Sequence, residues 1–425
     1  MIQEKITIGT KYPLEGILTI PENGETLFPA VVLVHGSGPN DMDEKIGNCY
    51  VFRDIAEGLA KRGIATIRYN KRTKTYGKQM VKDAEFESFT VFDETIEDAI
   101  FATDLLREDS RIDSSKIFIA GHSMGAMLAP RIDAEGGNYA GLILLAGSPR
   151  KLEEIIIDQQ DEAIAELNPI LKGIANSQVK KMRKNLDKLY EMSDDEAMKT
   201  IFLGKYNRLY YLKEWGLKPT ANYLKDLQKP IILMQGDADF QVSVEKDFNK
   251  YKEILADKPN ATFKLYPNLN HLFMQKVYGN INKASKEYKK PQHVEACVID
   301  DIAGWMQDIK GKNEDSKVTK LSPTEILAKK ENLVCECPEL DCEWHGNCKD
   351  CMALHRYHVT APNCMEEGAE NKEGIDTDFI NERANIVYVK RSKKNRTAVS
   401  GWLITYGLAA AIPAISYFIW KRSKK

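Results

Sequence analysis

The chain has 425 residues, of which 43% are hydrophobic and 29% are charged. This composition argues against a disordered chain and against a membrane protein with many spans, and the length allows a large α/β domain with additional segments. The net charge of −2 hides a basic tail, because the residues from Lys390 onward include nine Lys or Arg and no Asp or Glu. An acidic body with a basic tail does not fit a nucleic-acid-binding protein, and we expect no nucleic-acid partner.

The first seventy residues predict the beginning of a sheet. Residues 5–10 and 15–21 alternate polar and apolar side chains, which indicates a hairpin. Residues 30–34 form a continuous apolar run, which is typical of a central parallel strand buried on both faces. That run ends in the loop His35-Gly36-Ser37-Gly38-Pro39.

Predicted strands and helices then alternate along the chain. The strands cover residues 64–69, 116–120 and 141–146, and the helices cover 54–62, 91–107 and 124–131. Strands that alternate with helices of this length indicate βαβ units and a doubly wound, mostly parallel sheet with helices on both faces.

Residues 151–228 interrupt this alternation with helical stretches, including 152–167 and 179–190, and with no convincing strand. We expect a helical lid insertion over the carboxyl edge of the sheet; extra helices packed on one side of the domain are the alternative. The sheet resumes with strands at 231–234 and 262–266, separated by a helix at 244–255. A helix at 294–309 closes the body.

The segment Gly121-His122-Ser123-Met124-Gly125 fits G-x-S-x-G and lies between a predicted strand and a predicted helix. A serine on such a turn projects its hydroxyl from the carboxyl edge of the sheet, and the glycines let the backbone turn tightly. The motif is weak alone, so its meaning depends on catalytic partners elsewhere in the chain.

Two later strand ends supply such partners. Asp239 follows the strand at 231–234, and His271 follows the strand at 262–266. A serine hydroxyl needs a base, and the base needs an orienting carboxylate. The order Ser, Asp, His is the order that accompanies a nucleophile elbow, so Ser123, Asp239 and His271 are the predicted catalytic residues. His293 is the rival base, and we interpret it as a surface residue.

These motifs together resemble the α/β-hydrolase superfamily and, within it, bacterial dienelactone-hydrolase and serine-aminopeptidase-like esterases. The resemblance covers residues 1–310 and implies an α/β-hydrolase fold. It depends on five matching elements: residues 35–39 with 41–44 following, residues 69–72, the Ser123 elbow, Asp239 with Val242 after it, and Asn270-His271.

The resemblance also implies a role for each site residue. Ser123 is the expected nucleophile, His271 its general base and then acid, and Asp239 the residue that holds the imidazole. The backbone N–H groups of Ser37 and Met124 form the expected oxyanion hole, each typically worth about 3 kcal/mol of barrier.

Three other residues have competing interpretations. Asp237 is the rival carboxylate, and the family's spacing of the acid three residues before a valine favours Asp239. For Arg72 we favour a structural pair with a carboxylate over a clamp for an anionic group. Cys49 is expected to be a buried thiol.

Residues 330–367 contain a cluster of candidate soft metal ligands. The chain there carries Cys335, Cys337, Cys342, His345, Cys348, Cys351, His355, His358 and Cys364. The N-terminus shows no secretory leader, so we expect the reducing cytosol, where such clusters hold metal more often than disulfides. We predict a small module with structural zinc bound by a subset of these residues; an iron–sulfur centre or redox-active thiols are the alternatives.

Residues 402–420 form a run of nineteen residues without a charge, with aromatic residues at both ends. This length can span a hydrocarbon core of about 30 Å, so we predict one C-terminal transmembrane helix at 400–421. A buried helix is the alternative. Residues 368–399 are the expected linker, and we expect a membrane-anchored chain with its catalytic domain in the cytoplasm.

The sequence therefore predicts a serine hydrolase that cleaves carboxylic ester or thioester bonds of a small-molecule acyl substrate through an acyl-enzyme, without a catalytic cofactor. A serine aminopeptidase or an acyltransferase with the same triad is one alternative. A noncatalytic membrane-tethered scaffold is another.

Overall fold

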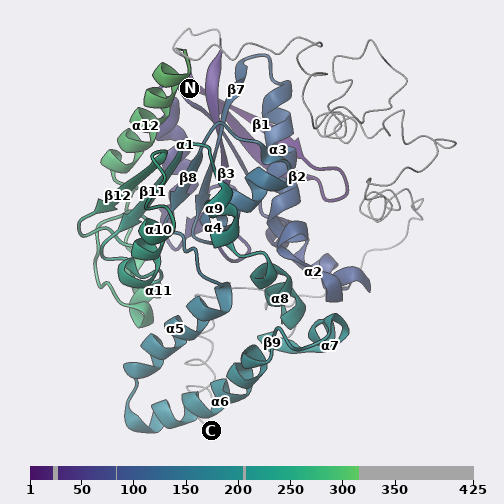
Figure 1. Ribbon diagram of the computed structural model, residues 1–425. Coiled ribbons are helices and arrows are strands. Elements are labelled where there is room, and N and C mark those ends of the chain that lie inside the picture. Colours follow the sequence, from purple (N-terminus) through teal and green to yellow (C-terminus); the bar gives the residue numbers. More distant parts are fainter. Residues whose placement is uncertain (23–26, 83, 204–206, 315–425) are drawn as a thin grey trace, which may run out of the picture. The chain divides into compact units, whose positions relative to one another are not determined.

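The computed structural model describes residues 1–22, 27–82, 84–203 and 207–314 (Figure 1). The predicted Cys/His module at 330–367, the linker at 368–399 and the transmembrane helix at 400–421 lie outside these residues. Within the described ranges, no helix is both long and apolar enough to cross a membrane.

An eight-stranded sheet organises the domain, in the order β1-β2-β6-β3-β7-β8-β11-β12. β1, β2 and β6 pair antiparallel, and all later neighbours pair parallel. This confirms the predicted mostly parallel sheet of an α/β-hydrolase fold. The strands are β1 (Ile2–Ile8), β2 (Leu14–Ile20), β3 (Phe28–Val34), β6 (Ala65–Tyr69), β7 (Ile112–His122), β8 (Leu142–Leu145), β11 (Ile231–Gly236) and β12 (Ala261–Tyr266).

Apolar cores lie on both faces of the sheet, because the central strands are buried on both sides. In β3, Val32 and Val34 belong to one core, and Val31 and Leu33 to the other. The first core includes residues of α3 (Glu97–Glu108) and α4 (Met124–Ile132), and the second includes residues of α1 (Val51–Ala60) and α12 (Ala296–Glu314). The continuous apolar run therefore has the physical cause expected for a parallel strand, which is burial by helices on both sides.

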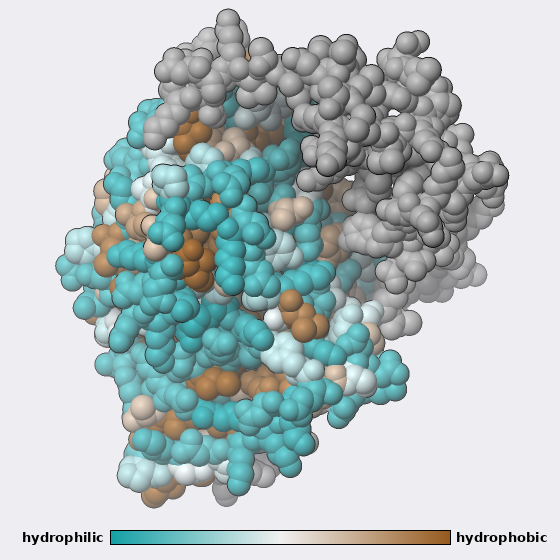
Figure 2. All heavy atoms as spheres, viewed as in Figure 1, coloured by the Kyte–Doolittle hydropathy of each residue, from teal (hydrophilic) through white to brown (hydrophobic). Residues whose placement is uncertain are grey.

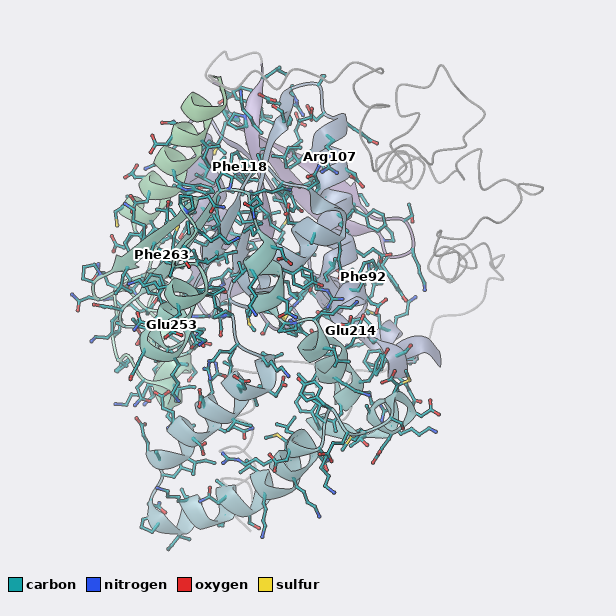
Figure 3. All side chains as sticks on the ribbon, viewed as in Figure 1. Phe92, Arg107, Phe118, Glu214, Glu253 and Phe263 are labelled. Atoms are coloured by element: carbon teal, nitrogen blue, oxygen red, sulfur yellow. The ribbon has the colours of Figure 1, made fainter. Side chains whose placement is uncertain are left out.

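Aromatic contacts fasten helices to this sheet. Phe118 on β7 packs edge-on against Trp305 of α12, with ring centroids 5.9 Å apart. Phe263 on β12 packs edge-on against Phe248 at 6.1 Å. Figure 3 labels Phe118 and Phe263 on their strands.

Several helices differ from their predicted form. The helix expected at 91–107 begins with a π-helical turn, η2 (Phe92–Ile96), before α3, and the helix expected at 244–255 is a π turn, η4 (Val244–Phe248), followed by α10 (Asn249–Ile254). Helix α2 (Arg72–Met80) was not predicted, because its largely polar sequence lacks an apolar period.

Smaller elements are β4 (Lys45–Ile46), β5 (Cys49–Tyr50), η1 (Ala84–Ser88), η3 (Asp133–Gly137), η5 (Ile281–Lys283) and α11 (Ala284–Glu287).

Residues 151–228, called the insertion below, are mainly helical as predicted. They form α5 (Leu152–Ala165), α6 (Pro169–Asp187), α7 (Asp194–Lys199), α8 (Leu209–Leu217) and α9 (Thr220–Asp226). The expectation of no strand is wrong, because β9 (Ile201–Leu203) and β10 (Asn207–Arg208) pair antiparallel. These strands are too short to show a period of two in the sequence.

The insertion lies next to the carboxyl edge of the sheet, and Figure 1 shows α5 to α8 beyond that edge. Gln159 of α5 donates to the Gln241 carbonyl at 2.8 Å. Glu214 of α8, labelled in Figure 3, pairs with Arg131 of α4 at 2.6 Å.

The visible surface is mainly hydrophilic with scattered apolar groups (Figure 2). On α6, the side chain of Ile170 is 77% exposed. Isolated apolar side chains of this kind are normal on protein surfaces and mark no site by themselves.

Candidate active site

Ser123 occupies a strained turn between β7 and α4. Its φ of 53° is positive, which is rare for a residue with a side chain and costs about 1–3 kcal/mol. The turn is held by a hydrogen bond from Ser123 N to the Leu145 carbonyl at 2.8 Å. A Cβ added at Gly121 would lie 2.2 Å from the Gly125 backbone, and one at Gly125 would lie 2.1 Å from the Val34 oxygen. The two glycines are therefore required for the elbow that the motif predicted.

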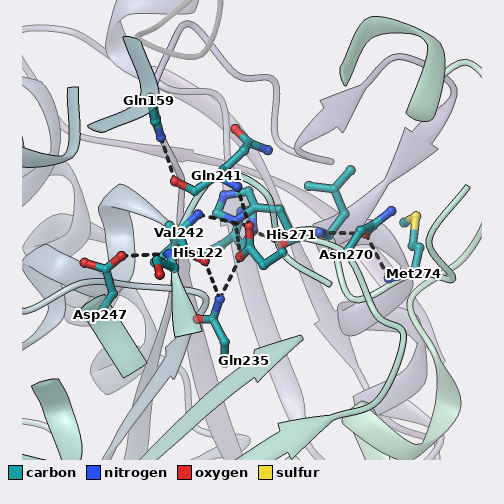
Figure 4. A network of polar contacts seen from close by, with 12 residues as sticks. His122, Gln159, Gln235, Gln241, Val242, Asp247, Asn270, His271 and Met274 are labelled. Atoms are coloured by element: carbon teal, nitrogen blue, oxygen red, sulfur yellow. Dashed lines mark hydrogen bonds and ion pairs between the residues drawn. The ribbon is translucent and has the colours of Figure 1, made fainter. Parts of the chain in front are cut away.

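His271, labelled in Figure 4, meets Asp239 where the loops after β11 and β12 come together, as predicted. His271 Nδ1 lies 2.7 Å from Asp239 Oδ2, and both side chains are buried. A carboxylate can only accept this bond, so we assign the proton to Nδ1, which leaves Nε2 as the proton acceptor of a base.

Asp239 is itself fixed by three further hydrogen bonds. Its Oδ1 accepts from Gln241 N at 2.7 Å and Val242 N at 3.0 Å, and its Oδ2 accepts from Gln235 Nε2 at 2.9 Å. The rival carboxylate, Asp237, instead accepts from Asn268 N at 2.6 Å. The geometry selects Asp239 as the partner of His271.

Asn270 shapes the loop that carries His271. Its side-chain oxygen accepts from Leu272 N at 3.0 Å and Met274 N at 3.2 Å, and its Nδ2 donates to Glu287 at 3.2 Å. Burial raises the pKa of Glu287, but hydrogen bonds from this amide and from nearby backbone N–H groups outweigh burial and lower the pKa overall. A buried carboxylate thus anchors the loop of the candidate base.

A buried pair behind the site, Glu44 and His122, was missed by the sequence interpretation. His122 Nδ1 lies 3.1 Å from Glu44 Oε2, and His122 Nε2 lies 3.0 Å from the His271 carbonyl oxygen. The Nε2 contact has hydrogen-bond geometry, whereas the Nδ1 contact is an ion-pair contact without it. The nearby carboxylate charge favours the doubly protonated imidazolium. The other Glu44 oxygen accepts from Gly36 N at 2.7 Å.

The charges of this pair shift the pKa of both residues. Burial lowers the pKa of His122, but the Glu44 carboxylate outweighs burial and leaves that pKa above its ordinary value. Burial raises the pKa of Glu44, and His122 reverses this so that the pKa is lowered. Both residues lie in motifs that were noted, at 41–44 and 121–125, but no sequence signal paired them.

The loop at residues 35–39 lies against the nucleophile. A Cβ added at Gly36 would lie 3.3 Å from Ser123 Cβ, which is closer than most Cβ contacts, so a side chain at this position would press against the nucleophile. Ser37 follows on this loop, and Met124 begins α4 directly after Ser123. The N–H groups of these two residues stay the predicted pair of oxyanion donors, and the N-terminus of α4 adds a favourable dipole for negative charge.

The remaining candidate residues have structural surroundings. Arg72 is buried and pairs with Asp98 and Glu97, as the structural interpretation predicted. Cys49 is buried, and burial raises the pKa of its thiol. The His293 side chain is 78% exposed and contacts Asp54 at 3.1 Å. We therefore assign none of these three to the candidate site.

In the part of the chain that the structure describes, no group of three or more His, Cys, Asp or Glu side chains could hold a metal ion. The predicted zinc ligands between Cys335 and Cys364 lie outside that part.

Comparison with known proteins identifies the relatives of this domain. The sequence profile of the family described as serine aminopeptidase, S33, matches residues 29–276. Esterase EstD from Thermotoga maritima is 40% identical over 296 residues, a match that spans 69% of this chain and 65% of the esterase.

Solved structures with low sequence identity also align. Est1E from Butyrivibrio proteoclasticus is 15% identical with a TM-score of 0.45, covering 72% of this chain and 99% of Est1E. Proline iminopeptidase from Mycobacterium smegmatis is 13% identical with a TM-score of 0.45, covering 73% of this chain and 100% of that chain.

The profile match covers more than half of the chain, and it includes the elbow, both partner loops and the loop at 35–39. The chain therefore belongs to the serine aminopeptidase S33 family of α/β hydrolases.

Proposed function

We propose that the protein is a serine esterase that cleaves carboxylic ester or thioester bonds through an acyl-enzyme formed on Ser123. The observation that carries this proposal is the 2.7 Å contact between His271 Nδ1 and Asp239 at the same sheet edge as the strained Ser123. The 40% identity to Esterase EstD supports ester bonds as the target.

The reaction begins with proton transfer from Ser123 Oγ to His271 Nε2 as the oxygen attacks the carbonyl carbon of the substrate. The carbonyl oxygen becomes an oxyanion, and the N–H groups of Ser37 and Met124 stabilise its charge. Collapse of this intermediate breaks the bond to the alcohol or thiol, which leaves with the proton from His271. Water then attacks the acyl-enzyme with His271 again as base, and the carboxylic acid is released.

Asp239 supports both halves of this reaction. Its bond to Nδ1 holds the tautomer in which Nε2 is free, and its negative charge stabilises the imidazolium. The three additional hydrogen bonds to Asp239 fix the orientation of the carboxylate.

A serine aminopeptidase is the second candidate. The family description names that activity. In addition, burial, Glu166 and Asp239 raise the pKa of Glu162 on α5 of the insertion. A carboxylate there is the type of group that a substrate amine requires.

The test uses the full-length chain with p-nitrophenyl esters of increasing acyl length, an acyl thioester, and aminoacyl p-nitroanilides. We expect ester turnover that Ser123→Ala lowers by at least about 10⁴-fold. Unchanged ester turnover in this variant contradicts the mechanism, and preference for the anilides selects the peptidase. Binding without turnover of any substrate supports the scaffold alternative.

We also propose, from the sequence, that residues 330–367 bind zinc and that residues 400–421 anchor the chain in a membrane. Elemental analysis of the full-length protein should give stoichiometric zinc that is lost in Cys348→Ser/Cys351→Ser. The chain should stay with membranes through alkaline carbonate extraction. Zinc-free folded protein contradicts the first proposal, and release by carbonate contradicts the second.

A further inference from the structure

A buried lysine lies beside the loop at residues 35–39, and the mechanism above gives it no role. Lys71 lies two residues after the end of β6 and is 1% exposed. Its ammonium lies 3.0 Å from the Gly36 carbonyl oxygen and 3.0 Å from Glu94 Oε1. Ordering and desolvating a lysine is costly, so its position next to the oxyanion loop calls for an explanation.

The Gly36 carbonyl and the Ser37 N–H belong to the same peptide group. That group is planar and trans, so its carbonyl oxygen and its amide hydrogen point in opposite directions. A cation that holds the Gly36 oxygen on one side therefore fixes the Ser37 N–H on the other. Asn40 Nδ2 adds a longer bond to the same oxygen at 3.3 Å.

The charge of Lys71 also changes the strength of the donor. A cation bound to a carbonyl oxygen polarises the peptide group and makes its N–H a better hydrogen-bond donor. The benefit is greatest when negative charge develops opposite that N–H, which happens in the transition state of acyl transfer.

Lys71 is kept in place by a chain of contacts that ends in the insertion. Glu94, on the π-helical turn η2, pairs with Lys71 and accepts from the Tyr211 hydroxyl. Tyr211 is on α8, and its hydroxyl lies 3.9 Å from the Met124 sulfur. The insertion is thus linked to both proposed oxyanion donors. It contacts Met124 directly, and it reaches the Gly36–Ser37 peptide group through Glu94 and Lys71.

We propose that Lys71 is a positioning residue that aims and polarises the Ser37 N–H of the oxyanion hole, with Glu94 and Tyr211 holding its ammonium. This proposal depends on the oxyanion hole of the proposed function. Because the N–H acts on charge that develops only in the transition state, loss of Lys71 lowers kcat and leaves KM almost unchanged.

The competing explanation is that Lys71 and Glu94 form an ion pair that matters only for folding. A double variant distinguishes a role in catalysis from a role in folding alone. Lys71→Met alone leaves the Glu94 carboxylate buried without its cation, which destabilises the fold. Lys71→Met/Glu94→Gln removes both charges, so stability recovers while the Gly36 oxygen remains without its ammonium.

Lys213 provides a matched control in the insertion. It is also buried, and its Nζ also contacts a backbone carbonyl and a carboxylate, those of Met192 and Asp194, each at 2.6 Å. Lys213→Met removes the same kinds of contact away from the oxyanion loop.

The experiment measures kcat, KM, Tm and inhibition by an aryl boronic acid, which mimics the tetrahedral intermediate, on the full-length chain with a p-nitrophenyl ester. We expect K71M and K71M/E94Q to lower kcat about 100- to 1,000-fold and to weaken inhibition by the boronic acid in the same proportion. Their KM values should stay within about twofold of the wild-type value. The Tm should fall in K71M and recover in K71M/E94Q. K213M should lower Tm with kcat within about twofold.

Recovery of wild-type kcat in K71M/E94Q overturns the proposal and leaves a structural ion pair. A raised KM at unchanged kcat also overturns it, because that result assigns Lys71 to substrate binding. Failure of the proposed function has a different signature, which is ester turnover that persists in Ser123→Ala.

Discussion

The two sides of Ser123 are built from different parts of the chain. On the side of the base, His271 is held by Asp239, by the loop of Asn270 and by the pair Glu44–His122, all from the sheet and its loops. On the side of the proposed oxyanion hole, the loop at 35–39 is held by Lys71, whose partner Glu94 accepts from Tyr211 of the insertion. Glu44 also holds this loop, by accepting from Gly36 N.

This difference indicates how the two sides respond to change. The side chains of the base are held by contacts within the core domain, and the insertion contacts this side at the Gln241 carbonyl, through Gln159. The oxyanion side contacts α8, so substitution in α8 should alter transition-state stabilisation more than it alters the base. Substitutions on each side test this comparison.

The largest effect is expected on the side of the base. Asp239→Asn should lower kcat by about 10⁴-fold with little change in KM, because an amide at this position favours the wrong tautomer of His271. Steady-state kinetics on a p-nitrophenyl ester measures both constants. Asp237→Asn is the matched control, since Asp237 contacts Asn268 N rather than a histidine; equal losses in the two variants contradict the assignment of Asp239.

The second effect concerns the stability that Glu44 and His122 provide. Glu44→Gln removes one charge of a buried pair and should lower the free energy of unfolding by about 3–5 kcal/mol. In the exposed pair Glu4–Arg111, Glu4→Gln should lower the free energy of unfolding by only about 0–1 kcal/mol.

The Glu44→Gln loss should also depend on pH. The raised pKa of His122 contributes stability that is complete below 6.5 and is lost as pH rises through the folded-state value. The lowered pKa of Glu44 contributes stability that is complete above 4.5 and is lost as pH falls through its folded-state value. Chemical denaturation across pH should therefore show the largest difference between wild type and variant between pH 4.5 and 6.5. A difference that grows above pH 6.5 contradicts the imidazolium assignment.

The smallest effect is expected from the insertion. Tyr211→Phe removes one hydrogen bond to Glu94, worth about 0.5–1.5 kcal/mol, and should lower kcat by about two- to tenfold. Tyr223 in α9 also donates to a carboxylate, that of Glu135, so Tyr223→Phe is its control and should leave kcat unchanged. Equal kcat in Tyr211→Phe and Tyr223→Phe would contradict a contribution of the insertion to transition-state stabilisation.

The sequence predicted the features that depend on local pattern. The continuous apolar run before His35 predicted a buried central strand, and the glycines around Ser123 predicted a turn in which added Cβ atoms would collide. Asp239 and His271 could be found because each follows a strand, and carboxyl ends of parallel strands share one edge.

The features that the sequence did not predict depend on burial and on contacts between distant residues. Glu44, Lys71 and Glu94 are charged residues, and their polarity predicts exposure, yet each is buried against a partner of opposite charge. His122 is 78 residues from Glu44 in sequence, and Glu94 is 23 residues from Lys71. No local sequence period relates residues that far apart.

The central claim, that Ser123 is the nucleophile, is tested most directly by a fluorophosphonate probe. After reaction of the full-length chain, intact-mass and peptide mass spectrometry should show one phosphonyl group on Ser123, with loss of ester turnover in the same proportion. Labelling should be absent in Ser123→Ala. Attachment to another residue, or ester turnover that survives complete labelling of Ser123, would contradict the proposed mechanism.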